Sequence, residues 1–239
     1  MKDFARFALI LLLTACATAR AQEQTAPNPY PKMAPVAAYL IADRAYEIAL
    51  ARSAGPASIS DHAEVLVLGR HGYQVAVKGD NGFVCLVSHS WFAGFDDADF
   101  WNPKSRGPEC MNPPAVRSVL PEFLARTDWV LAGDTKAQII AKTKAAFASH
   151  RFGQPAPVSF AFMLSKLGYL NNVHTAWLPH VMPFVPFGQE AEWGAGLPGS
   201  PILETVGSPY QPTTLYIPVR RWSDGSPAPT PAPMDHHAM

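Results

Sequence analysis

Prolines recur along the whole of this 239-residue chain and limit how long any helix or strand in it can be. The sequence has 24 prolines and 16 glycines, and proline both breaks a helix interior and donates no hydrogen bond within a sheet. Apolar residues make up 48% of the chain, which is typical of a globular protein with a core. We therefore expect one domain built from short elements, since the length suits a single domain with short extensions.

Basic and acidic residues balance, with 19 of each, so the formal net charge is zero. A protein that binds nucleic acid or an anionic membrane by charge carries a basic excess or a basic patch. The composition gives no such excess, and we expect no nucleic-acid partner. Contact with a membrane is expected only through a lipid anchor, for which the amino terminus provides the argument.

Residues 1–21 have the pattern of an export signal. Lys2 and Arg6 precede a short apolar run from Phe7 to Leu13, and small residues follow. The run is far shorter than the roughly 20 apolar residues of a membrane-spanning helix. We therefore expect a bacterial protein that is exported, and that is either periplasmic or anchored at the outer membrane.

Two processing sites compete within this signal. Ala19-Arg20-Ala21 offers a small-x-small cleavage site. Leu13-Thr14-Ala15-Cys16 resembles a bacterial lipobox, in which Cys16 would become the lipidated first residue of the mature chain. Both sites stay open, and residues 22–33 behind them read as a polar spacer.

Export changes the interpretation of the cysteines. Besides Cys16, the chain has only Cys85 and Cys110. Two cysteines in a small exported domain predict a disulfide, because the compartment is oxidising. The alternative is two separate buried thiols.

Hydrophobic periodicity divides residues 34–224 into short helices and strands. We expect helices over residues 35–53, 113–124 and 134–150, and strands over residues 64–68, 73–78, 83–91, 158–164, 180–187 and 215–219. Gly79-Asp80-Asn81-Gly82 predicts a tight hairpin between the strands beside it, and residues 92–111 read as an irregular loop. Pro121 is expected to kink or split its helix, and Pro183 and Pro186 to restrict the strand around them to a sheet edge.

This order of elements predicts a single α+β domain over residues 34–224, with a mostly antiparallel sheet of about five to six strands and helices packed on it. The order broadly resembles small sensor-type folds of the PAS, GAF and profilin kind, and the resemblance extends to element order alone. Residues 225–239 are rich in proline and alanine, and we expect a disordered tail there.

No catalytic motif stands out. Gly194-x-Gly196-x-x-Gly199 matches the dinucleotide fingerprint as text, but prolines 198 and 201 prevent the helix that the fingerprint needs, so we expect a glycine turn and no cofactor. Asp96, Asp97 and Asp99 are expected to form a solvated acidic turn rather than a calcium loop. Dispersed catalytic residues remain an alternative, with His71, His89 and His180 as the histidines to test.

The segment around His180 is the main candidate for a binding site. In an extended chain His180 and Met182 point to the same side, and Trp177 precedes them. We expect these three side chains to line a ligand site, and the competing interpretation is a buried, hydrogen-bonded His180. Aromatic residues gather in two stretches, which we expect to form a second core, a lid or the lining of a pocket. The first stretch has Trp91, Phe92, Phe95, Phe100 and Trp101, and the second has Trp177, Phe184, Phe187 and Trp193.

His and Met together also suit copper, and the adjacent His236 and His237 in the tail are weak candidates for a metal site. The function expected from these observations is the binding of a small apolar or aromatic molecule, or of a protein partner, without evident catalysis. The alternatives are a periplasmic hydrolase with dispersed catalytic residues and a periplasmic copper-type metal-binding protein.

Overall fold

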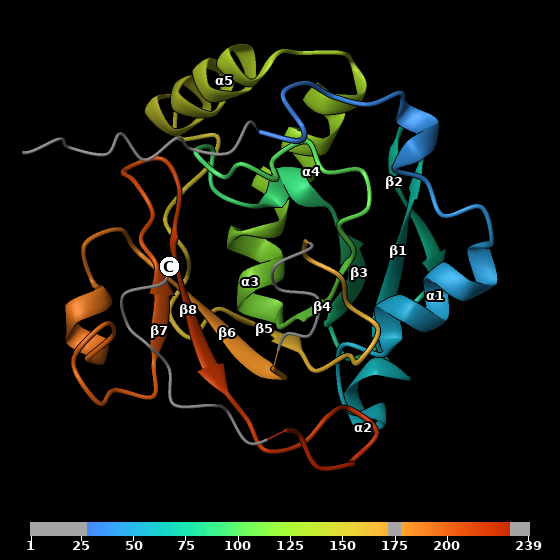
Figure 1. Cartoon of the computed structure of the whole chain (residues 1–239), viewed down its shortest axis with the longest axis vertical. Helices are drawn as coiled ribbons and strands as arrows, with labels where there is room; N and C mark the ends of the chain where they lie inside the picture. The colour runs from blue at the N-terminus through green and yellow to red at the C-terminus, as the bar shows by residue number, and fades with distance from the viewer. Residues whose placement is uncertain (1–27, 172–177, 230–239) are drawn as a thin grey trace, which may run out of the picture.

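One mixed sheet of eight strands organises the computed structural model, which describes residues 28–171 and 178–229 (Figure 1). The strands are β1 (Glu64–Gly69), β2 (Gly72–Val77), β3 (Val84–Ser88), β4 (Gly107–Met111), β5 (Phe160–Met163), β6 (His180–Val185), β7 (Leu203–Thr205) and β8 (Thr213–Pro218). They lie in the order β2-β1-β3-β4-β5-β6-β8-β7, and every neighbouring pair is antiparallel except β1 and β3. The α+β class is confirmed, whereas the expected count of five to six strands is too low.

The additional strands come from segments in which glycine and proline mask the strand pattern. Residues 107–111 were expected within an irregular loop, but all five are buried and form β4 between β3 and β5. The short β7 lies at an edge of the sheet, directly after the glycine turn. Pairing with Val87 and Ser88 of β3 overrides the weak strand propensity of Gly107 and Pro108.

The expected hairpin at residues 79–82 is wrong, because β1 lies between β2 and β3. The hairpin instead joins β1 to β2 through Arg70 and His71. The segment 78–83 crosses the start of β1, and a Cβ at Gly79 would overlap the backbone nitrogen of Glu64. The Asn81 side chain fixes this crossing by donating to the carbonyl of Ile59 and accepting from the backbone nitrogen of Phe83.

Helices cover both faces of the sheet. They are α1 (Arg44–Arg52), α2 (Ala57–Ser60), α3 (Pro113–Ser118), α4 (Leu120–Leu131) and α5 (Lys136–Ala148), with 3-10 turns η1 (Val36–Ala38), η2 (Ser90–Phe92) and η3 (Glu190–Trp193). Pro121 does split its helix, because α3 ends before Val119 and α4 begins after it. The first helix is shorter than expected: Asp43 accepts from the nitrogens of Ala45 and Tyr46, which starts α1 at Arg44.

Figure 1 shows the strands arranged around α3 and α4, with α1 lying outside the sheet. We call the inner side the α4 face, where Leu86, Met111 and Met182 pack against Phe123. The outer side is the α1 face, where Val65 and Val87 pack against Leu50. Side chains alternate between these faces along each strand, as strand geometry requires.

Cys85 and Cys110 are joined by a disulfide on the α1 face, as the sequence predicts. They face each other directly in the pairing of β3 with β4.

None of the helices within the described residues is long and apolar enough to cross a membrane.

The first aromatic stretch forms a second core. Trp91, Phe95, Phe100 and Trp101 are buried together with Tyr39, Val130 and Ile139. The second stretch is dispersed: Phe184 belongs to the core of the α4 face, while Phe187 and Trp193 are each 43% exposed. Trp177 lies outside the described residues.

The expected edge position of the strand beginning at His180 is wrong, because β6 pairs with β5 on one side and β8 on the other. Proline is accommodated by a gap in one ladder. Residues His180, Val181, Phe184 and Val185 pair with β8, and the positions between them, Met182 and Pro183, do not. The missing N–H of Pro183 therefore costs no hydrogen bond to β8.

Both ends of the described chain fold back on the domain. Tyr30 and Met33, from the expected spacer, pack against the second core. At the other end, Ala228 donates its backbone N–H to the carbonyl of Arg220 over 2.9 Å. The export signal with Cys16, and residues 230–239 with His236 and His237, lie outside the described residues.

Candidate functional site

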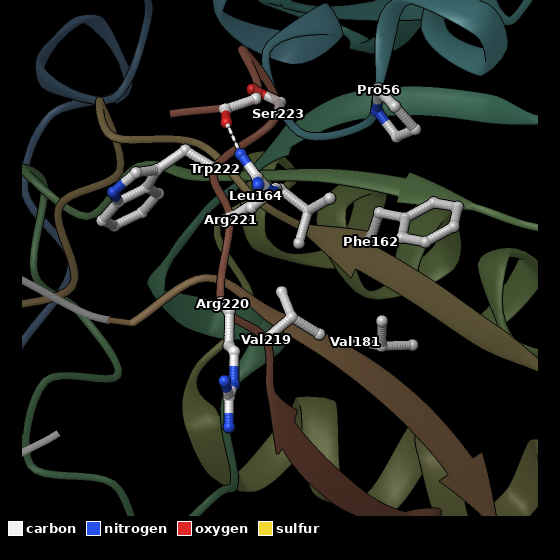
Figure 2. A pocket seen from close by; sticks show the side chains of 10 residues that line it. Pro56, Phe162, Leu164, Val181, Val219, Arg220, Arg221, Trp222 and Ser223 are labelled. Atoms are coloured by element: carbon white, nitrogen blue, oxygen red, sulfur yellow. Dashed lines mark hydrogen bonds between the residues drawn. The ribbon is translucent and has the colours of Figure 1, made fainter. Parts of the chain in front are cut away.

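A groove of about 520 Å³ opens on the α1 face, beyond the part of that face that α1 covers (Figure 2). Helix α1 contacts β1, β3 and β4, and the groove lies over β5 and β6. Its lining residues are Pro56, Phe162, Leu164, Val181, Val219, Arg220, Arg221, Trp222, Ser223 and Gly225.

The apolar floor follows from strand pairing. Cys110 pairs with Phe162, Phe162 with Val181, and Val181 with Ile217, so these side chains form one row on the α1 face. Val65 and Cys85 begin the row and are covered by α1, whereas Phe162 and Val181 are only partly buried. The groove is therefore the uncovered continuation of a buried row.

The rim is the segment after β8. Backbone bonds from Trp222 to Ser226 and from Ser223 to the carbonyl of Leu164, each 3.0 Å, fix this segment beside β5. Arg221 donates from Nη1 to the carbonyl of Gly225 over 2.7 Å, as Figure 2 shows. Arg220 and Arg221 are exposed, and both line the groove.

A separate polar cluster lies where β1 and β3 part. The two strands pair only at Glu64 with Val84 and at Val65 with Cys85. Beyond this point the nitrogen of Leu68 donates to Glu47 Oε1 over 2.8 Å, because β3 no longer pairs with β1 there. Glu47 is only 2% exposed, and burial raises the pKa of its carboxyl group.

His89 is the imidazole of this cluster, and its ring stacks on Trp91 with a centroid distance of 4.9 Å. Arg106 Nη1 lies 3.4 Å from Nδ1 of His89. Because a guanidinium group only donates, Nδ1 accepts and Nε2 carries the proton. Burial, and then the charge of Arg106, hold the pKa of His89 well below its usual value, so the ring is neutral.

Glu109 lies on β4 in the same region and is 1% exposed. Burial raises the pKa of its carboxyl group to about 8, and a hydrogen bond with Ser88 opposes this shift. Within the described residues, Glu109 Oε1 and His89 Nε2 are buried and have no hydrogen-bond partner. The cluster thus holds a neutral acid and a neutral base in the interior, and none of its residues lines the groove.

His180 and Met182 do not face the groove. Both are buried on the α4 face, while Val181 between them points to the α1 face. His180 Nδ1 lies 2.8 Å from the carbonyl of Leu178, and its ring meets Tyr216 edge-on at 5.3 Å. A ligand role for His180 and Met182 remains a prediction, and Trp177, its third member, lies outside the described residues.

The other sequence candidates are turns. His71 is exposed in the hairpin between β1 and β2. Asp97 accepts from the nitrogen of Asp99 over 2.7 Å, as a solvated turn would require. The glycines at 194, 196 and 199 all have positive φ and lead into β7 rather than a helix. Within residues 28–171 and 178–229, no three His, Cys, Asp or Glu side chains come together as a metal site.

Sequence reasoning missed both the groove and most of the polar cluster. The signal for the groove was Arg220-Arg221-Trp222 directly after the last strand, and the signal for the cluster was an acid within the apolar strand that ends at Met111.

No protein-family model, curated protein or solved structure significantly matches this chain.

Proposed function

We propose that this protein binds a small apolar or aromatic molecule in the groove of Figure 2. The observation that carries this proposal is the pair of uncovered apolar side chains Phe162 and Val181, which lie next to each other in the sheet. Together with Val219 they line a pocket of about 520 Å³. Pockets of about 300–1,000 Å³ with apolar linings and a few polar groups are typical of small-molecule sites. The proposal agrees with the function expected from the sequence, but it uses different residues.

The test is binding of the neutral fluorescent probe N-phenyl-1-naphthylamine to the protein with its disulfide intact. Val219→Asn places an amide in the groove and should weaken probe binding about tenfold, because an apolar contact is lost and an amide is desolvated. Val75→Asn is the matched control, since Val75 is 44% exposed on the edge strand β2. Absence of probe binding, or equal weakening by both variants, would refute the proposal.

We also propose that the protein is exported, with a lipid anchor at Cys16 as one of two routes. The Cys85–Cys110 disulfide supports an oxidising compartment. Mass spectrometry of the protein from its native host should find an amino terminus at Cys16 or near Gln22. An intact Met1 would exclude export by either route, and loss of membrane association in Cys16→Ser would favour the lipid anchor.

An enzyme with dispersed residues is the second candidate function, and the His89–Glu109 region favours it. Neutral acids and bases with shifted pKa values are frequent in active sites. His89→Gln keeps hydrogen-bonding capacity but cannot exchange a proton near neutral pH. A hydrolytic activity on ester or amide probes that persists in this variant would exclude the candidate.

The resemblance in element order to PAS, GAF and profilin folds is likewise a proposal. Its support is a hairpin of β1 and β2 that begins a helix-covered sheet. Superposition of the eight-stranded sheet on such domains would test it, and a different strand order would refute it.

A further inference from the structure

The described residues that line the groove include two arginines, Arg220 and Arg221, and no aspartate or glutamate. Figure 2 shows the two arginine side chains pointing in opposite directions, Arg220 beside Val219 and Arg221 toward Ser223.

The acid nearest to these arginines in the chain is Asp224. Asp224 is already engaged, because Lys166 Nζ lies 2.7 Å from its Oδ2 and Ser226 donates to its Oδ1. These hydrogen bonds from Lys166 and Ser226 hold the pKa of Asp224 well below its usual value.

Neither arginine has a carboxylate partner in the described chain. The ion pairs found there are His62–Asp80, Arg126–Glu122, Lys142–Asp134 and Lys166–Asp224. Arg221 uses Nη1 to hold the Gly225 carbonyl, and a guanidinium group has five N–H donors. Donors at this rim thus remain for a ligand.

The arrangement has a direction along the groove. Phe162, Val181 and Val219 face the same opening in Figure 2, and Arg220 extends from the chain next to Val219. A ligand lying on these three side chains would bring its end to Arg220. Guanidinium groups bind oxyanions in a planar, two-donor geometry that suits carboxylate and phosphate alike.

We propose that the groove selects an amphipathic anion, with an alkyl or aryl body on Phe162, Val181 and Val219 and an oxyanion head at Arg220, where the positive charge of Arg221 adds to the attraction. This inference rests on the proposed function, because it names the class of ligand for the same groove. Charge complementarity supports it, since an uncharged ligand of the same shape would leave the Arg220 guanidinium group without an anionic partner.

The test compares octanoate with octanamide, which share the same chain and differ in charge. Each competes with bound N-phenyl-1-naphthylamine at low salt. Octanoate should displace the probe at about three- to tenfold lower concentration, as expected for exposed charged hydrogen bonds. The advantage should shrink in 0.5 M salt, because exposed charges are screened.

Variants separate the head group from the body of the ligand. Arg220→Gln/Arg221→Gln should remove the preference for octanoate and leave octanamide unchanged. Arg220→Gln alone keeps the Arg221–Gly225 bond and should remove part of the preference, which guards against loss of the turn. Arg70→Gln/Arg117→Gln is the matched control, because both residues are exposed, neither lines the groove, and the same charge is lost.

The outcomes distinguish this inference from the proposed function. If neither compound displaces the probe, the groove is not a site for such ligands and both proposals fail. If both compounds displace it equally, or if the preference survives in Arg220→Gln/Arg221→Gln, only the inference about the oxyanion is overturned. If the control variant loses the preference for octanoate to the same extent, the preference comes from the net charge of the protein, and the inference is also overturned.

Discussion

Replacing Glu109 by glutamine should stabilise the protein at neutral pH. The carboxyl group has a pKa of about 8 in the folded protein and an ordinary value of 4.5, because it is buried. Between these two pH values the folded state holds a proton that the unfolded state has released. The contribution of Glu109 to the free energy of unfolding is therefore fully present below pH 4.5, and it is lost as the pH rises towards 8.

The size of this effect follows from the shift. One pKa unit corresponds to about 1.4 kcal/mol, so the shift of Glu109 costs about 3 kcal/mol at pH 7 and about 5 kcal/mol above pH 8. Glu109→Gln has nearly the same shape as the protonated acid and never ionises. The variant should equal the native protein near pH 4.5 and exceed its unfolding free energy by about 3 kcal/mol at pH 7.

Urea unfolding followed by tryptophan fluorescence at several pH values from 4.5 to 8.5 would measure this difference. Taking the difference between native and variant curves removes the titration of all other groups that both proteins share. The control is Glu192→Gln, since Glu192 is exposed and the substitution should leave the pH dependence unchanged. A difference that stays constant with pH, or a Glu109→Gln protein that is less stable throughout, would refute the reasoning.

Three further predictions concern stability. His180→Ala should lower the unfolding free energy by about 1–3 kcal/mol in urea titrations, because the ring is buried and held by the Leu178 carbonyl; a loss below 0.5 kcal/mol would contradict this. Cys85→Ala/Cys110→Ala should cost about 3 kcal/mol, since the disulfide closes a loop of sequence separation 25, and unchanged stability would show that the bond does not restrict the unfolded chain. Gly79→Ala should lower the melting temperature by several degrees, because a Cβ there overlaps the Glu64 backbone; an unchanged melting curve would mean that the crossing can shift freely.

The proposed ligand groove and the polar cluster are separate features of the molecule. The groove lies over β5 and β6, and His89 and Glu109 lie within the interior near β3 and β4. Substitutions in one should therefore leave the other intact. Glu109→Gln is expected to change stability without changing displacement of the probe by octanoate.

Local chemistry in the sequence determined the features that depend on neighbouring residues. Asn112 caps α3, Pro121 ends one helix and begins the next, and Thr135 with Gln138 caps α5, all through contacts within a few positions. The Cys85–Cys110 pairing could also be predicted, because the domain contains only two cysteines and the sequence predicts export to an oxidising compartment. These features need no knowledge of the rest of the fold.

Tertiary structure alone decided which strands are neighbours. The turn at residues 79–82 does reverse the chain, but β1 occupies the space between β2 and β3, and no local pattern reveals that insertion. The proline at 183 did not exclude an interior strand, because the ladder to β8 has a gap at that position. Pairing between distant segments also placed Phe162 beside Val181 and buried Glu109. Both the groove and the shifted pKa depend on these contacts, because burial is set by what distant parts of the chain cover.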